Sequence, residues 1–281
     1  MKRTLSMLYL KLLKLKHFIK SKLLKNKYIY SLDKHGLEGR QIAQAFLKTL
    51  NPGNDPQEKQ ILDTLHQYRA DLSADTRKIS FDEIGSTTKM TVAEVAKRAA
   101  SPEEWTRFFY QLSKPNKINN ILEIGTNLGV SGQYFLKALE GKKNTKFITL
   151  EGVKGLCDIA QERLMLLSTE QEFEVVHGLY DQTLINIVNK EILFDLLFID
   201  GNHRYDATLK YFELLKNNIA DRALVVFDDI HWSNGMRKAW KEIITQRGVV
   251  FSVNFFKLGM IVFDPKQSEP TNDHFELFLS L

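Results

Sequence analysis

Apolar residues follow two spacings along the chain, and the second half of the sequence alternates between them. Short apolar runs are followed by longer segments in which apolar residues recur every three or four positions. The short runs predict strands and the longer segments predict helices. Strands that alternate with helices favour a parallel sheet with helices on both faces, an α/β doubly wound fold. The predicted strands are NILEI (120–124), KFITLE (146–151), FEVVHG (173–178), DLLFID (195–200) and ALVVFDD (223–229).

The last two apolar runs have no helix between them. VVFSVNFF (249–256) and MIVF (260–263) are separated only by Lys257, Leu258 and Gly259. Two strands joined by so short a turn predict an antiparallel hairpin, which we expect at the edge of the sheet.

The first part of the chain has a helical pattern throughout. Polar helices are expected over residues 37–80, and a loop, FDEIGS (81–86), precedes two further helices. The chain therefore divides into an arm at 1–30, a helical N-terminal segment at 31–115 and an α/β domain at 116–281.

The arm is basic and amphipathic. Leucine or isoleucine recurs at Leu5, Leu8, Leu12, Leu15 and Ile19, which places an apolar stripe on one face of a helix. Lysine recurs too often for a transmembrane span. Two interpretations stay open: the helix lies on an anionic membrane surface, or it packs on the body or on a second copy in a homodimer.

Charge and cysteine content narrow the possible partners and compartment. The chain of 281 residues carries a net charge of +5, yet residues 1–30 hold nine basic residues and no acid. The rest of the chain therefore sums to −4, which argues against a nucleic-acid partner for the body. A single cysteine, Cys157, excludes an internal disulfide and suits a reducing, cytoplasmic location, with the inner membrane surface as a peripheral site for the arm.

Acidic residues follow the predicted strands, where ligands of such folds bind. The segment ILEIGTNLGVSG is not a dinucleotide fingerprint, because Asn127 and Val130 stand where its second and third glycines belong. Its acid, Glu123, lies two residues before Gly125 and favours a ligand with an ammonium group. Glu151, at the end of the second strand, is placed to accept hydrogen bonds from ribose hydroxyls.

These segments carry a family resemblance. EIGTNLG, TLE, FDLLFIDGNH and VVFDD together resemble class I S-adenosylmethionine-dependent methyltransferases, over roughly residues 80–263. Within that class they look most like metal-assisted small-molecule O-methyltransferases of the catechol and macrolide-sugar types. The resemblance implies a Rossmann-like, seven-stranded sheet whose last strand is antiparallel, a lid from the N-terminal segment, and S-adenosylmethionine as cofactor. The implied cofactor-binding residues are Glu123, Gly125, Thr126, Gly129, Ser131, Glu151, Gly178 and Asp200.

The acids after the fourth and fifth strands are the candidate metal ligands. Asp200, Asp228 and Asp229 offer the oxygen ligands that Mg²⁺ or a similar cation prefers. By resemblance, the metal holds the acceptor hydroxyl and lowers its pKa. Relatives of the catechol type often have Asn at the position of Asp229, so this residue either strengthens metal binding or faces away and caps a backbone N–H.

Two further residues complete the predicted acceptor side. His203 is a candidate catalytic base, although ordering the loop after the fourth strand would explain it equally well. Trp232 is expected to form a wall of the acceptor pocket.

The expected function is therefore methyl transfer from S-adenosylmethionine to a hydroxyl of a small molecule or a glycan. The alternatives are a metal-independent methyltransferase and a non-catalytic, cofactor-binding module recruited to membranes. The sequence does not identify the acceptor.

Overall fold

The computed structural model describes residues 2–168, 172–271 and 273–279. Its large sheet has eight strands in the order β10-β8-β9-β7-β6-β3-β4-β5, and a two-stranded sheet pairs β1 with β2. The predicted doubly wound α/β fold is confirmed. The chain divides into two compact units, one made of Met1–Ala43 and Leu197–Leu281 and the other of Gln44–Leu196.

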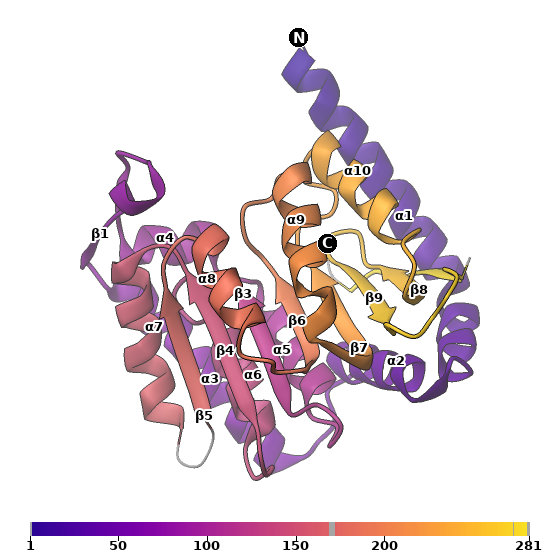
Figure 1. Cartoon of the computed structure of the whole chain (residues 1–281), viewed down its shortest axis with the longest axis horizontal. Coiled ribbons are helices and arrows are strands. Elements are labelled where there is room, and N and C mark those ends of the chain that lie inside the picture. Colours follow the sequence, from indigo (N-terminus) through magenta and orange to yellow (C-terminus); the bar gives the residue numbers. More distant parts are fainter. Residues whose placement is uncertain (1, 169–171, 272, 280–281) are drawn as a thin grey trace. The chain divides into compact units, whose positions relative to one another are not determined.

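Three parallel strands form the centre of the 44–196 unit. Helices cover both faces, so the first two strands are almost entirely buried, whereas the third, at the edge of the sheet, is only partly buried; Figure 1 shows α8 in front of the strands and α3 behind. Glu123 is in register with Thr149, and Glu151 with His177, so these strands end at a common edge. The strands are β3 (Asn120–Ile124), β4 (Lys146–Glu151) and β5 (Glu172–His177).

The other elements of this unit surround those strands. The helices are α3 (Pro56–Ala74), α4 (Val92–Ala99), α5 (Glu103–Ser113), α6 (Gly132–Leu139), α7 (Lys154–Leu167) and α8 (Tyr180–Val188). A short hairpin of β1 (Lys78–Ser80) and β2 (Lys89–Thr91) encloses the 3₁₀ turn η1 (Asp82–Ile84), which falls in the predicted FDEIGS loop. Helix α2 (Gly36–Leu50) and strand β6 (Phe194–Ile199) each cross a boundary between the units.

The unit with both chain ends contains the antiparallel part of the sheet. Strand β9 pairs antiparallel with both β7 and β8, as the predicted hairpin requires. The hairpin does not form the edge of the sheet, however, because a further strand, β10, pairs parallel with β8. The sheet thus has one strand more than the seven predicted. The elements are α9 (Tyr205–Leu215), η2 (Lys216–Asn218), β7 (Ile219–Phe227), α10 (Asn234–Ile243), β8 (Val249–Asn254), β9 (Gly259–Phe263) and β10 (His274–Glu276).

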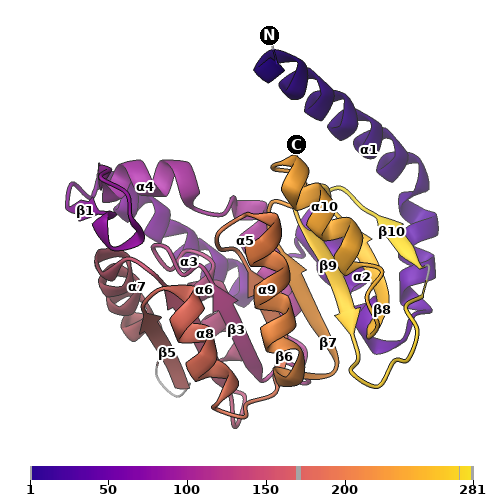
Figure 2. The ribbon, with the colours of Figure 1, turned by 45° about the horizontal axis from the view of Figure 1, so that its top comes forward.

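The basic arm is part of one long helix, α1 (Lys2–Asp33), whose second half lies beside β10 (Figure 2). The buried His17 ring shares a hydrogen bond of 2.8 Å with the carbonyl oxygen of Leu277, and Lys20 pairs with Glu276 at 3.0 Å. The Phe18 ring meets Phe278 edge-on at 5.3 Å. One face of the arm therefore packs on the C-terminal tail.

The predicted apolar stripe lies elsewhere on α1. Its side chains are exposed, and a further exposed leucine extends it: Leu8, Leu12, Leu15, Ile19 and Leu23. The side chain of Leu5 lies outside the described residues. Among the helices that the structure describes, none is both long and apolar enough to cross a bilayer. The roles of arm and lid assigned to residues 1–30 and 31–115 stay predictions.

Candidate functional site

The glycine-rich loop after β3 is held tightly against the end of β4. The backbone N–H groups of Gly125 and Thr126 both donate to the carbonyl oxygen of Leu150, at 2.9 and 3.0 Å. Gly125 and Gly129 have φ angles of 106° and 74°, and Asn127 between them also lies in the left-handed region. A Cβ on Gly129 would lie 3.1 Å from the Cβ of Ala160 in α7. Glycine at 129 therefore permits both the turn and the close approach of the helix.

Glu123 anchors this loop from inside the protein. Its carboxylate is fully buried and accepts hydrogen bonds from the Ser131 hydroxyl at 2.5 Å and the Thr149 hydroxyl at 2.7 Å. Thr149 also shares a hydrogen bond with Thr126. Burial raises the pKa of Glu123 to about 7, against the opposing effect of the two hydroxyls. Glu123, Ser131 and Thr126 thus form one buried network beneath the loop.

Glu151 ends β4 with its carboxylate turned to the same loop. One oxygen accepts from the N–H of Asn127 at 2.9 Å and the other from the N–H of Val153 at 3.0 Å. Burial raises its pKa, while the N–H donors favour the ionised form. A carboxylate has about four acceptor sites, so Glu151 keeps capacity for ligand hydroxyls.

The residues around Glu151 contact the FDEIGS loop, which the sequence predicts to be part of the lid. The η1 carboxylate of Glu83 accepts from the N–H of Lys154 at 2.6 Å and lies 3.4 Å from the His177 ring. A Cβ on Gly152 would lie 2.9 Å from the Ile84 side chain. Gly178, with a φ of 141°, donates to the carbonyl oxygen of Glu151. The FDEIGS loop therefore packs on the residues that follow Glu151, which is predicted to accept hydrogen bonds from the ribose.

The predicted metal ligands lie in the unit that holds the chain ends. Of the predicted ligands Asp200, Asp228 and Asp229, the first two each offer a ligand atom within 4.8 Å of the other and of His203, which was predicted as a base and not as a ligand. Asp229 is not part of this described group, and Asp200 lies 3.5 Å from the His203 ring nitrogen. The N–H of Asp228 donates to the carbonyl oxygen of Ile199, which aligns the ends of β6 and β7. The two acids therefore meet, as expected for neighbouring parallel strands.

A lysine that sequence reasoning missed joins this cluster. The Lys257 ammonium lies 2.7 and 2.8 Å from the two oxygens of Asp228 and 3.0 Å from Asp229. It comes from the turn between β8 and β9, far along the chain from the acids. Burial and the two carboxylates move the Lys257 pKa in opposite directions, and the net effect raises it. Asp229 therefore faces the cluster rather than away from it.

The cluster of Asp200, Asp228, Asp229, His203 and Lys257, called the acidic cluster below, is short of positive charge. Burial, and next the charge of Asp228, raises the pKa of Asp200 well above its usual range, and the pKa of Asp229 is raised for the same reasons. Three carboxylates facing one ammonium leave two negative charges. A divalent cation would balance them, and carboxylate oxygen with imidazole nitrogen is a suitable ligand set. The residues present thus fit such a cation.

A cavity of about 270 Å³ lies beside the acidic cluster, in the same unit. We call it the α1 cavity. Trp232, the predicted pocket wall, is 70% exposed and lines it. The residues that line it are Leu10, Lys11, Lys14, Asp229, His231, Trp232, Phe256 and Lys257.

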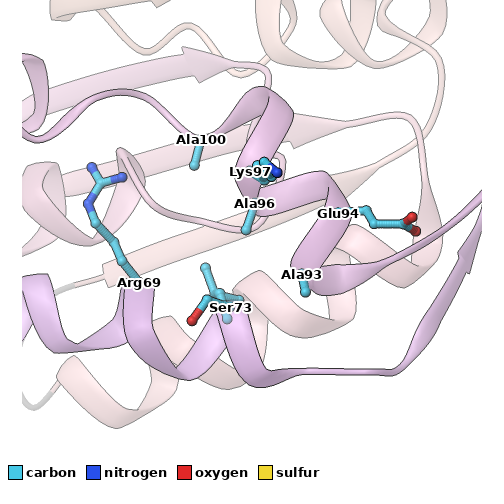
Figure 3. A pocket seen from close by; sticks show the side chains of 8 residues that line it. Arg69, Ser73, Ala93, Glu94, Ala96, Lys97 and Ala100 are labelled. Carbon is cyan, nitrogen blue, oxygen red and sulfur yellow. The ribbon is translucent and has the colours of Figure 1, made fainter.

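A second cavity, of about 450 Å³, lies between α3 and α4 in the other unit. Figure 3 shows small side chains on its walls and the Glu94 carboxylate turned away from Arg69. The Arg69 guanidinium donates hydrogen bonds to the carbonyl oxygen of Ser101 at 2.5 Å and to the hydroxyl of Thr106 at 3.3 Å. Among the described residues, none that follows a strand of the large sheet lines this cavity, so we assign it no catalytic role.

Comparisons with known proteins agree with the predicted family. Residues 122–230 match a family model described as a methyltransferase domain. An O-methyltransferase from Bacillus cereus, solved with SAH, is 21% identical, with a TM-score of 0.53 over 78% of this chain and 96% of that one. The O-methyltransferase TomG from Streptomyces achromogenes, involved in tomaymycin synthesis and solved with SAM, is 17% identical, with a TM-score of 0.52 over 79% and 95%. No curated protein matches the chain.

These matches agree with the predicted resemblance to methyltransferases. Residues 122–230 match a methyltransferase domain, and the chain has the fold of the solved O-methyltransferases to which it is similar.

Proposed function

We propose that this chain transfers a methyl group from S-adenosylmethionine to a hydroxyl of a small molecule or a glycan, assisted by a divalent cation. The observation that carries the proposal is the acidic cluster, in which two strand ends gather three carboxylates beside a single lysine. Packing alone would not favour three buried or partly buried acids so close together. The methyltransferase domain, and the SAM and SAH in the two similar structures, support the choice of reaction and cofactor.

The cofactor would be held by the residues after β3, β4 and β5. Glu151 would accept hydrogen bonds from the ribose hydroxyls, and the backbone of the Gly125–Gly129 loop would approach the cofactor closely. The remaining candidates are Glu123, Thr126, Ser131, Gly178 and Asp200. Because the first three form a buried network, we propose that they act mainly by fixing the shape of the loop.

The acceptor would bind at the acidic cluster. Asp200, Asp228 and His203 would hold the cation, which supplies Lewis-acid chemistry that lowers the pKa of the acceptor hydroxyl. Lys257 keeps the carboxylates of Asp228 and Asp229 in place. His203 would alternatively take the hydroxyl proton as a general base.

Replacing Glu151 by Gln tests the cofactor site. The Gln amide has the same shape as the carboxylate, but only one of its two terminal atoms can accept a hydrogen bond. Each charge-assisted hydrogen bond is worth about 1.5–3 kcal/mol. We expect S-adenosylmethionine to bind about tenfold or more weakly in a calorimetric titration. The exposed Glu104, changed to Gln, is the matched control and should bind the cofactor normally. Equal affinity in both variants would rule out the ribose assignment.

We also propose that a cytoplasmic enzyme contacts an anionic membrane surface through α1. The support is the exposed stripe of Leu8, Leu12 and Leu15, flanked by lysines in a segment without acids. The full-length protein should sediment with phosphatidylglycerol vesicles at low salt and be released by high salt. Serine at these three positions should abolish sedimentation. If the protein ignores vesicles but the same serines dissociate a dimer in light scattering, the stripe is instead an interface between two copies.

A further inference from the structure

The α1 cavity adds a chemical requirement to the acceptor. We propose that the acceptor carries an anionic group, a phosphate or a carboxylate, which Lys11 and Lys14 of α1 bind while its hydroxyl lies at the acidic cluster. This inference rests on the proposed function, because it names the class of molecule that the proposed reaction would methylate.

Three segments far apart in the sequence build this cavity. The α1 helix contributes Lys11 and Lys14, the loop after β7 contributes Trp232, and the turn between β8 and β9 contributes Phe256. The Phe256 ring stacks on the ring of His231, with centroids 4.5 Å apart, and lies 5.6 Å from the ring of His17 in α1. Phe256 therefore contacts both α1 and the loop after β7, which carries Asp228 and Asp229. These aromatic contacts fix the walls of the cavity within this unit.

The cavity is continuous with the proposed reaction site because two members of the acidic cluster line it. Asp229 and Lys257 belong to both. A ligand in the cavity would therefore meet apolar and aromatic walls, the acidic cluster and two further lysines. Its volume of about 270 Å³ suits a single ring with small substituents.

The two lysines differ from a neighbouring lysine on the same helix. Lys20 is neutralised by Glu276 at 3.0 Å. Within residues 2–168, 172–271 and 273–279, neither Lys11 nor Lys14 forms an ion pair, and the Lys14 ammonium lies 5.9 Å from the Phe278 ring. Two unneutralised ammonium groups on a concave, partly apolar wall attract an anion more strongly than lysines on an open helix face. The geometry thus selects for a negatively charged acceptor.

Binding of phenyl phosphate and phenol to the full-length protein tests the inference. The two probes share a ring and differ in the anionic group, and saturation-transfer NMR titrations with a chelator present exclude binding through a metal. Because charged hydrogen bonds are worth about 1.5–3 kcal/mol, phenyl phosphate should bind about tenfold more tightly than phenol. The double variant Lys11→Gln, Lys14→Gln should remove this preference. The matched double variant Lys16→Gln, Lys27→Gln, on exposed positions of α1 that do not line the cavity, should keep it.

Each outcome decides the matter. Equal binding of the two probes, or an equal loss in the two double variants, would overturn the inference. Displacement of phenyl phosphate by short-chain phosphatidylglycerol would support it and identify a lipid headgroup as the anion, whereas displacement by inorganic phosphate alone would support it and indicate a water-soluble acceptor. Cofactor binding, measured separately by calorimetry, separates this result from the proposed function. A protein that binds S-adenosylmethionine but shows no preference for the anion refutes only the inference.

Discussion

Replacing Asp200 by Asn is expected to reduce methyl transfer and divalent-cation affinity together, each by about 100-fold or more. Mutation of residues that only hydrogen-bond to a metal ligand already lowers metal affinity or activity by about 10–100-fold, and Asp200 is proposed as a ligand itself. The amide oxygen is an uncharged and weaker ligand than the carboxylate. The substitution also removes one of the three acids that face the single Lys257 ammonium. The variant therefore has one negative charge fewer for a cation to balance. Turnover measured over a range of Mg²⁺ concentrations gives both quantities.

The exposed Asp206, changed to Asn, is the matched control for this experiment. It should keep normal turnover and metal dependence. Cofactor affinity should change little in either variant, because the main proposed anchors follow β3 and β4. Full activity of the Asp200→Asn variant in a chelator would refute metal assistance and establish the metal-independent alternative.

The His203→Ala variant should lose about 10²–10⁴-fold in turnover if this residue is the general base. Its ring lies 3.5 Å from Asp200, and its nitrogen is also one of the three candidate metal-ligand atoms. Metal affinity separates the two roles, because loss of a base leaves it intact and loss of a ligand lowers it in parallel with turnover.

The control is His66→Ala, which removes an exposed imidazole paired with Glu103 and should leave turnover unchanged. If the His203→Ala variant has normal turnover, the remaining role for His203 is to order the loop after β6. Neither a catalytic nor a metal-binding role would survive that result.

The pattern of apolar residues predicted most of the large sheet because the signal is local. Each parallel strand is a short apolar run, and its end is followed by the polar residues that we propose as ligand-binding groups. Strand β10 escaped prediction because only Phe275 of its three residues is buried. Pairing with β8, rather than any pattern of its own, makes this segment a strand.

The candidate site was predictable where it depends on strand ends and not where it depends on distant contacts. Asp200 and Asp228 were expected to meet because each follows a strand, and they do. Lys257 was expected only as a turn residue, since nothing in its neighbours reveals that the β8–β9 turn brings it to Asp228. In the same way, the sequence does not reveal that the Glu123 carboxylate is occupied by two hydroxyls.

The packing of α1 on β10 makes the two ends of the polypeptide interdependent. The helix that carries Lys11 and Lys14 is held by Leu277, Phe278 and Glu276, which belong to the last residues of the chain. A shortened C-terminus would therefore remove the support of the N-terminal helix and, with it, one wall of the α1 cavity. Removing residues 276–278 and removing the start of α1 should therefore have the same effect, which is loss of this wall and of the proposed binding of an anionic acceptor.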